Sequence, residues 1–399
     1  MIAQPPTPVK QTERFLSLDV FRGIVMVFLM TEATLELPRL ASYYPNSSFW
    51  RFIAYQTSHE LWIGCRAWDL IQPSFMFIVG MAVPFSIAAR LSRGATGSDL
   101  WKHTWRRAII LILLGILLRS MGRAQTYFTF EDVITQVGLG YPILVWLGFR
   151  PVRTQWLAFA LILIGYWALF AFSPVSHPEL MQEYNRADNQ PYQPLTGFFA
   201  HWNIHTNPAN TFDQWFLNLF PREKPFVVNR GGYVTLSFIP SLGTMLLGLL
   251  AGQRLRRTES VRANVRTLVI WGLVGVALAV ALQVAGVCPI VKRIWTPTWV
   301  LFSGGLVLLM LAGCVWAVEL GQWRRGTFWF VVVGANSMAA YLLHWTIHNW
   351  LVDNVRTNTS LFIGGLSAGV QHLLVGSIAF AIAWYLMVWL YRKKIFIRI

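Results

Sequence analysis

The stretch HELWIGCRAWDLIQPSFMFIVGMAVPFSIAAR, residues 59–90, joins a cluster of ionisable side chains directly to an apolar run. The cluster contains His59, Glu60, Arg66 and Asp69, and the apolar run carries prolines and a glycine. A helix needs about 20 mostly apolar residues to span a bilayer. Ionisable side chains at the mouth of a span are costly unless they have partners, so they are candidates for a function.

Two interpretations of this cluster are open. Trp62 and Trp68 are typical of an aromatic belt that positions a helix at the membrane interface. An interfacial belt that includes charged residues would also account for His59 and Asp69. For this pair, however, we favour a functional role.

The composition of the chain predicts a polytopic, all-α membrane protein. Of 399 residues, 55% are hydrophobic and only 13% are charged, against roughly a quarter charged in soluble domains. Apolar runs recur along the whole length and predict about ten transmembrane helices. The predicted spans are 17–35, 69–90, 106–121, 133–149, 156–173, 233–252, 267–287, 297–318, 328–350 and 370–391.

The net charge of +16 is explained by membrane topology and not by nucleic-acid binding. Lys and Arg concentrate in short segments on the cytoplasmic side of membrane proteins. With both termini placed in the cytoplasm, 20 of the 33 basic residues fall on that side. They are Lys10, Arg14, Arg90, Arg93, Lys102, Arg106, Arg107, Arg150, Arg153, Arg254, Arg256, Arg257, Arg262, Arg266, Arg324, Arg325, Arg392, Lys393, Lys394 and Arg398.

The N-terminus and the cysteines carry little signal. Residues 1–15 are polar and Pro-rich, so we expect a cytoplasmic tail and no cleavable signal peptide. The remainder, 16–399, is read as one integral-membrane domain. Cys65 lies near His59 and is a conceivable nucleophile, but a buried structural thiol is the favoured interpretation.

Two large loops are predicted on the periplasmic side, at about 36–68 and 174–232. Loops of this size are uncommon and often functional. The second contains HWNIHTNPANTFDQWF (201–216), and a short amphipathic helix is expected near Asn210–Phe220.

Polar residues also lie within the predicted spans. Asp19 and Arg22 are three residues apart on one helical face and should neutralise each other; contact of Arg22 with a cofactor phosphate is the alternative. Glu32 faces either a cavity or a cation of an outer loop. A polar stripe in the ninth span should face the bundle interior, and it consists of Asn336, Ser337, Tyr341, His344 and His348. An H-x-x-x-H pair suits zinc, but a third ligand and a base are missing, so no metal is expected.

The residues near His59 suit acid–base or nucleophilic catalysis. A histidine with a pKa near 6.5 can act as general base or as nucleophile at neutral pH. Asp69 would orient the imidazole of His59, as the acid of a catalytic triad does. As an alternative, Asp69 caps the second helix, and the two roles are compatible.

Several motifs together resemble the heparan-α-glucosaminide N-acetyltransferase family of transmembrane acetyltransferases, of which this chain would be a bacterial member. RFLSLDVFRGI (14–24) precedes H-x-x-W-x-G and D-L-x-x-P-x-F-x-F-x-x-G, and the similarity continues to YRKKIF (391–396). Between them lie LSFIPSLGTMLLGLLAG (236–252), VKRIWTPTW (291–299) and GANSMAAYLLH (334–344). The resemblance implies that acetyl-CoA binds from the cytosol and that the acyl group crosses to an amino sugar. It also implies that His59 is the catalytic histidine and Asp69 the motif aspartate.

Further site residues are predicted from charge and position. Contacts to the acyl donor are expected from Arg22, Lys102, Arg106, Arg107, Asn336, Ser337, His344, Arg392, Lys393 and Lys394. Contacts to the acceptor are expected from Glu32, Glu60, Trp62 and Lys292.

The sequence therefore predicts an acetyl-CoA-dependent acyltransferase of the bacterial inner membrane, with a sugar or amino-sugar acceptor on the periplasmic side. A transporter or flippase for a sugar or a lipid-linked glycan is the alternative, and a non-catalytic scaffold is a weaker third. The sequence leaves open which acceptor is used and whether it is acylated on nitrogen or oxygen. It also leaves open whether transfer is direct or passes through an acyl-histidine, and whether the protein is a homodimer.

Overall fold

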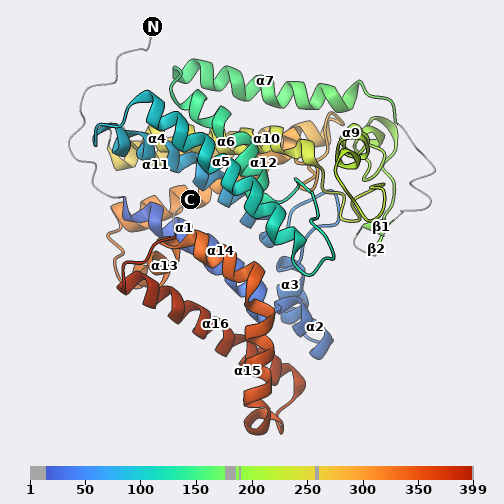
Figure 1. Cartoon of the computed structure of the whole chain (residues 1–399), viewed down its shortest axis with the longest axis vertical. Helices are drawn as coiled ribbons and strands as arrows, with labels where there is room; N and C mark the ends of the chain where they lie inside the picture. The colour runs from blue at the N-terminus through green and yellow to red at the C-terminus, as the bar shows by residue number, and fades with distance from the viewer. Residues whose placement is uncertain (1–14, 176–185, 188–189, 257–259, 398–399) are drawn as a thin grey trace.

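The computed structural model describes residues 15–175, 186–187, 190–256 and 260–397 and shows a polytopic bundle of helices (Figure 1). The predicted tail 1–15 lies almost wholly outside the described residues. Helices occupy all ten ranges predicted to span the membrane. They are α1 (Leu16–Leu35), α4 (Ile71–Leu91), α5 (Gly97–Ser120), α6 (Val133–Gly148), α7 (Val152–Ala171), α10 (Phe238–Leu255), α11 (Val261–Val284), α12 (Pro297–Val315), the pair α13 (Thr327–Gly334) and α14 (Ser337–Thr346), and α16 (Ala368–Arg392).

The chain is a multi-pass membrane protein, although fewer than ten helices meet a strict criterion for spanning. Among the described residues, six helices are long and apolar enough to cross a membrane, and a bent pair would add a seventh. The six are α4 with its leading turn, α7, α10, α11, α12 and α16. Helix α6 has only 16 residues, and α1 and α5 carry several charged side chains.

The ninth span was predicted as one continuous helix, and this prediction is wrong. Helices α13 and α14 meet at an angle of 74°. The break lies at Asn336, whose side-chain amide donates to the Ile395 carbonyl at 2.9 Å and accepts from the Ile397 amide at 3.2 Å. The chain then continues into α15 (His348–Ile363), most of which lies between the ninth and tenth predicted spans.

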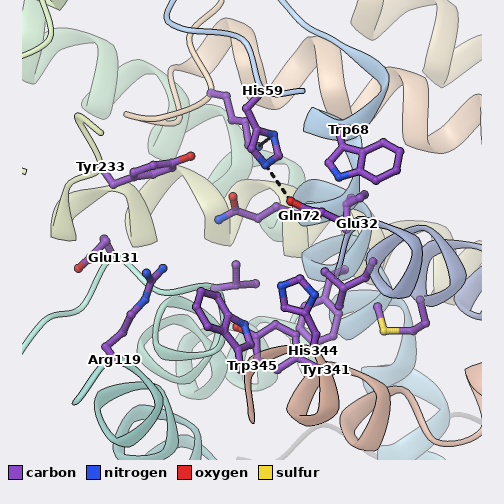
Figure 2. Close-up of a pocket in the computed structure, with 16 residues that line it drawn as sticks. Glu32, His59, Trp68, Gln72, Arg119, Glu131, Tyr233, Tyr341, His344 and Trp345 are labelled. Carbon is purple, nitrogen blue, oxygen red and sulfur yellow. Dashed lines mark hydrogen bonds and ion pairs between the residues drawn. The ribbon is translucent and has the colours of Figure 1, made fainter. Parts of the chain in front are cut away.

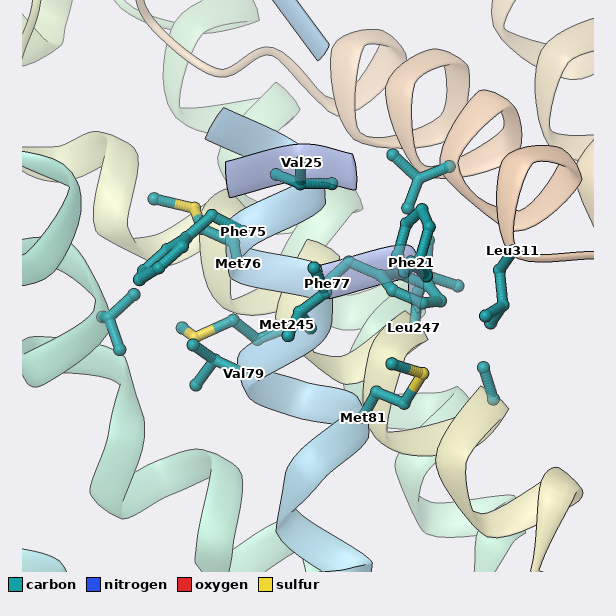
Figure 3. Close-up of a cluster of buried hydrophobic side chains, with 14 of the residues drawn as sticks. Phe21, Val25, Phe75, Met76, Phe77, Val79, Met81, Met245, Leu247 and Leu311 are labelled. Carbon is teal, nitrogen blue, oxygen red and sulfur yellow. The ribbon is translucent and has the colours of Figure 1, made fainter. Parts of the chain in front are cut away.

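The core of the bundle is built around α10, which is buried along most of its length. Small residues let α10 approach α4 closely, as is common between membrane helices. A Cβ atom on Gly80 would collide with the Met245 carbonyl, and one on Gly248 with the Phe77 carbonyl. Figure 3 shows the surrounding apolar side chains from α1, α4, α10 and α12 packed together.

A second group of helices packs around α1. Helices α13, α14 and α16 contact α1 on one side, while α4 and α12 contact it on the other. In Figure 1, α13 and α16 lie below α1, α14 overlaps it, and α4 to α7 with α10 to α12 lie above it. Helix α1 therefore lies at the junction of the two groups.

The long segment between α7 and α10 contains several short elements among its described residues. It contains a short ribbon of β1 (Arg186–Ala187) and β2 (Gln190–Pro191), and helix α9 (Pro208–Phe216). The helix predicted near Asn210–Phe220 is thus confirmed, beginning two residues earlier because the Asn207 side chain caps it at Asn210. Aromatic residues of this segment, Trp202 and Tyr192 among them, form a second buried cluster with Trp62.

The first outer loop also contains helices. Helix α2 (Leu40–Tyr43) and helix α3 (Ser48–Gln56) follow α1, and a 3-10 turn (Ala67–Leu70) leads into α4. The irregular residues 57–66 between α3 and this turn carry His59.

Candidate functional site

The loop that carries His59 is fixed to the loop that precedes α12. Ile63 and Val291 form an isolated antiparallel bridge, and the Gly64 amide donates to the Ile290 carbonyl at 3.0 Å. Gly64 has a φ of 127°, which side-chain-bearing residues rarely adopt. This bridge brings Lys292 next to His59, although the two residues are far apart in the sequence.

Asp69 is the centre of the site. Its side chain is fully buried and accepts hydrogen bonds from four donors. His59 Nδ1 lies 3.0 Å and Lys292 Nζ 2.9 Å from Oδ1, and the backbone amides of Glu60 and Arg66 lie 3.1 and 3.0 Å from Oδ2. The carboxylate therefore contacts the imidazole and also accepts from the Arg66 amide at the start of the 3-10 turn. The predicted role as N-cap of the second helix is wrong in detail, because Asp69 lies inside that turn and the N-cap of α4 is Leu70.

Lys292 completes this arrangement from the other loop. It is only 5% exposed, and its Nζ atom also lies 3.2 Å from His59 Nδ1. A buried lysine needs a counter-charge, and Asp69 provides it. The structure places this residue, predicted to contact the acceptor, in contact with the two candidate catalytic residues.

The second ring nitrogen of His59 faces Glu32, which lies near the C-terminal end of α1. The distance from Nε2 to Glu32 Oε1 is 3.3 Å, and Figure 2 shows this contact as a dashed line. The His59 side chain is 36% exposed, so it is reachable from the adjoining cavity. The structure shows both environments predicted for Glu32, because this residue lines the cavity and also faces His59 of the loop that follows α1.

The cavity beside His59 has a volume of about 320 Å³ and lies between α1, α4 and α14. Polar residues from other segments also line it: Arg119 at the end of α5, Glu131 just before α6, and Tyr233 just before α10 (Figure 2). Its full lining is Met26, Leu29, Glu32, His59, Trp68, Ile71, Gln72, Phe75, Arg119, Glu131, Val133, Tyr233, Lys292, Tyr341, His344 and Trp345.

The surroundings of His59 favour its protonated form. Burial and the Lys292 charge act to lower the pKa of His59, but hydrogen bonds to Asp69 and Glu32 outweigh them and hold the pKa above its ordinary value of 6.5. Cys65 is different, since burial and the Asp69 charge raise the pKa of its thiol to about 12. A thiol that stays protonated is a poor nucleophile, so the structural interpretation of Cys65 is supported.

Other residues of the opening stretch have structural partners away from the cavity. Glu60 pairs with Arg66 at 3.0 Å, and Trp62 is buried and donates to the Trp202 carbonyl at 2.9 Å. Neither Glu60 nor Trp62 lines the cavity, which argues against their predicted contacts to the acceptor. Trp62 and Trp68 are both buried in protein, so the prediction of an interfacial belt is wrong for them.

The polar stripe of the ninth span lies at and after the bend, with Asn336 at the break and Ser337, Tyr341 and His344 on α14. Tyr341 and His344 line the cavity, and Tyr341 also donates to Asp132 at 3.1 Å. Asn336 is fully buried against the C-terminal backbone, and Ser337 begins α14 without lining the cavity. His344 thus lies in the cavity, whereas the other two predicted donor contacts do not.

The basic residues predicted to meet donor phosphates lie on separate parts of the bundle. Lys102 and Arg106 are exposed on α5, and Arg107 of the same helix donates to the Tyr141 hydroxyl at 2.9 Å. The second set is exposed at the end of α16, which packs against α1 and α13, and consists of Arg392, Lys393 and Lys394.

Three further observations concern the remaining predictions. Arg22 lies 3.7 Å from Asp19, as expected for a neutralising pair. Within the described part of the chain, no three His, Cys, Asp or Glu side chains converge as a metal site. His344 and His348 stack with ring centroids 5.5 Å apart.

The sequence interpretation missed Arg119, Glu131 and Tyr233 in the cavity. Burial raises the pKa of Glu131, and Asp132 beside it pairs with Arg119 at 3.0 Å. The sequence did contain a signal for Glu131, because Glu131 and Asp132 are ionisable residues at the mouth of a predicted span. The same rule identified His59.

Comparison with known proteins gives one consistent relationship. No protein-family model matches the chain. The heparan-alpha-glucosaminide N-acetyltransferase of Homo sapiens is 22% identical over 431 residues, covering 97% of this chain and 60% of the relative. The enzyme of the same name from Mus musculus is 22% identical over 443 residues, covering 99% and 62%. The chain spans about three fifths of the length of these curated relatives, and over nearly its whole length it is distantly related to the heparan-alpha-glucosaminide N-acetyltransferases.

Proposed function

We propose that this protein is a transmembrane acyltransferase that moves an acetyl group from cytosolic acetyl-CoA to a sugar or amino-sugar acceptor on the periplasmic side of a bacterial inner membrane. The observation that carries the proposal is the triad of His59, Asp69 and Lys292 at the wall of a polar cavity. The distant relationship to named acetyltransferases supports the same reaction class.

The chemistry needs only what this site contains. A thioester is already activated, so the enzyme must supply either a base for the acceptor or a nucleophile for the acetyl group. Asp69 and Lys292 hold the Nδ1 side of His59, which leaves Nε2 as the reacting atom facing the cavity. Both an acyl-histidine course and direct transfer are compatible with this orientation.

The donor is proposed to approach from the cytoplasmic side. There the exposed basic residues of α5, or those at the end of α16, would bind the phosphates of CoA by charge-assisted hydrogen bonds. Its pantetheine arm would extend between α1 and α14 toward Tyr341 and His344, which line the cavity. An extended arm reaches only part-way through a hydrocarbon core of about 30 Å. This fits a reacting group that lies inside a vestibule.

The acceptor is proposed to bind on the periplasmic side of the same cavity. Glu131, Arg119 and Tyr233 offer charged and hydroxyl groups there, and Trp68 and Trp345 offer aromatic faces. Such a mixture suits the hydroxyls and apolar face of a sugar ring. Transfer to nitrogen and transfer to oxygen are both compatible with it, as are a monomer and a homodimer.

A transporter for a sugar or a lipid-linked glycan is the alternative, and the sharp bend between α13 and α14 favours it, because broken helices often line transport sites. The two functions differ in CoA binding. Protein reconstituted in proteoliposomes should bind CoA and transfer radiolabelled acetyl from acetyl-CoA on one face to aminosugars or sugars on the other. Absence of CoA binding together with uptake of unmodified glycan would favour the transporter.

A further inference from the structure

Both ring nitrogens of His59 face a carboxylate. Nδ1 lies 3.0 Å from Asp69 and Nε2 lies 3.3 Å from Glu32. Two carboxylates at these distances favour an imidazolium with a proton on each nitrogen. Lys292 Nζ, which lies 3.2 Å from Nδ1, then donates to Asp69 Oδ1 at 2.9 Å and not to the ring. An imidazolium has no lone pair with which to attack a thioester or accept a proton. The site therefore needs a group that removes the proton from Nε2.

The two carboxylates differ in what else they bind. Asp69 is fully buried and holds Lys292 and two backbone amides in addition to His59. In the described part of the chain, the Glu32 carboxylate has His59 Nε2 as its hydrogen-bonding partner, and its side chain is 32% exposed beside the cavity. Lys292 and His344 are the other charged or titratable groups that act on Glu32. Only Glu32 is thus both in contact with Nε2 and free to exchange a proton with the cavity.

We infer that Glu32 is a catalytic residue that carries the proton of His59 Nε2 during acyl transfer, an inference that rests on the proposed function. Glu32 takes the proton from Nε2 and becomes a neutral carboxylic acid, and His59 becomes neutral with a lone pair on Nε2. When the C–S bond of the thioester breaks, the Glu32 acid gives its proton to the CoA thiolate and forms the CoA thiol.

The protons balance on both courses. In direct transfer, Nε2 takes the proton of the acceptor amine or hydroxyl as the acceptor attacks the carbonyl, which restores the imidazolium beside an ionised Glu32. On the acyl-histidine course, Nε2 bonds to the acetyl carbon. The acceptor then displaces Nε2, and its proton passes through Glu32 back to the ring.

The test compares Glu32→Gln with wild type, because glutamine keeps the size and a hydrogen-bonding oxygen but cannot carry a proton. General acid–base catalysis contributes about 10²–10⁴-fold, so we expect acetyl transfer to fall by about that factor while CoA affinity and thermal stability hold. Glu36→Gln is the matched control, since Glu36 is an exposed glutamate four residues further on that pairs with Arg39. It should retain wild-type activity.

Two further variants separate a proton carrier from a positioning residue. Glu32→Asp should recover part of the activity, and Glu32→Ala should be activated by added formate, which a purely structural role would not show. A Glu32→Gln variant within a few-fold of wild type, or a faster one, would overturn the inference. If His59→Ala is also fully active, the proposed function itself fails. If His59→Ala is inactive while Glu32→Gln is active, only the role of Glu32 fails.

Discussion

The buried pair of Asp69 and Lys292 permits a quantitative prediction. Asp69→Asn removes the negative charge opposite a lysine that is 5% exposed, and its amide group can accept fewer of the four hydrogen bonds. Breaking a buried ion pair by removing one partner costs about 3–5 kcal/mol, since it leaves an uncompensated charge. We therefore expect the free energy of unfolding of Asp69→Asn to fall by about that amount.

The cause can be isolated with a double-mutant cycle. Lys292→Met removes the orphaned charge, so the double variant should be more stable than the sum of the single effects by about 2–3 kcal/mol, at the upper end of coupling between contacting residues. SDS titration in detergent micelles measures the unfolding free energies. The exposed pair of Glu36 and Arg39 provides a control cycle, in which coupling should stay below about 1 kcal/mol. Additivity within about 0.5 kcal/mol for Asp69 and Lys292 would refute the proposed pairing.

Three other predictions concern different parts of the molecule. Burial raises the pKa of Asp213 from 3.8 to about 7, so the folded protein keeps this proton at a pH where the unfolded chain loses it. The free energy of unfolding of wild type should therefore fall as the pH rises from about 4 to about 7, at most by about 1.4 kcal/mol per pH unit, and Asp213→Asn should abolish this fall. Gly80→Ala should cost about 1–3 kcal/mol by overpacking, whereas Gly165→Ala, with open space around it, should be harmless in the same unfolding assay. Lys102→Gln should weaken CoA binding and reduce its salt dependence in calorimetry, whereas equal effects of Arg153→Gln would contradict a local phosphate site.

Much of the fold was predictable because apolar runs about 20 residues long are a strong signal. The ten predicted ranges all contain helices. The bend at Asn336 was not predictable, since it depends on hydrogen bonds to the C-terminal backbone some sixty residues away. Helix α15 was not predicted because polar side chains interrupt its sequence, HNWLVDNVRTNTSLFI, which therefore contains no apolar run about 20 residues long.

The candidate site was predictable in part. His59 and Asp69 lie ten residues apart in one motif, so the sequence was sufficient to suggest their pairing, and the structure places them in contact. The position of Lys292 depends on the bridge between Ile63 and Val291, a long-range contact that no local pattern encodes. Trp62 was misread because its burial depends on the outer segment that folds over it.

The central claim is that His59 carries the chemistry of acetyl transfer, and turnover of acetyl-CoA by purified His59→Ala tests it most directly. His59 is partly exposed at the cavity, so the variant should keep the melting temperature of wild type within a few degrees. It should lose acetyl transfer by at least about 10²-fold, the lower end for a missing acid–base group. A stable His59→Ala protein that transfers acetyl groups at the wild-type rate would contradict the account.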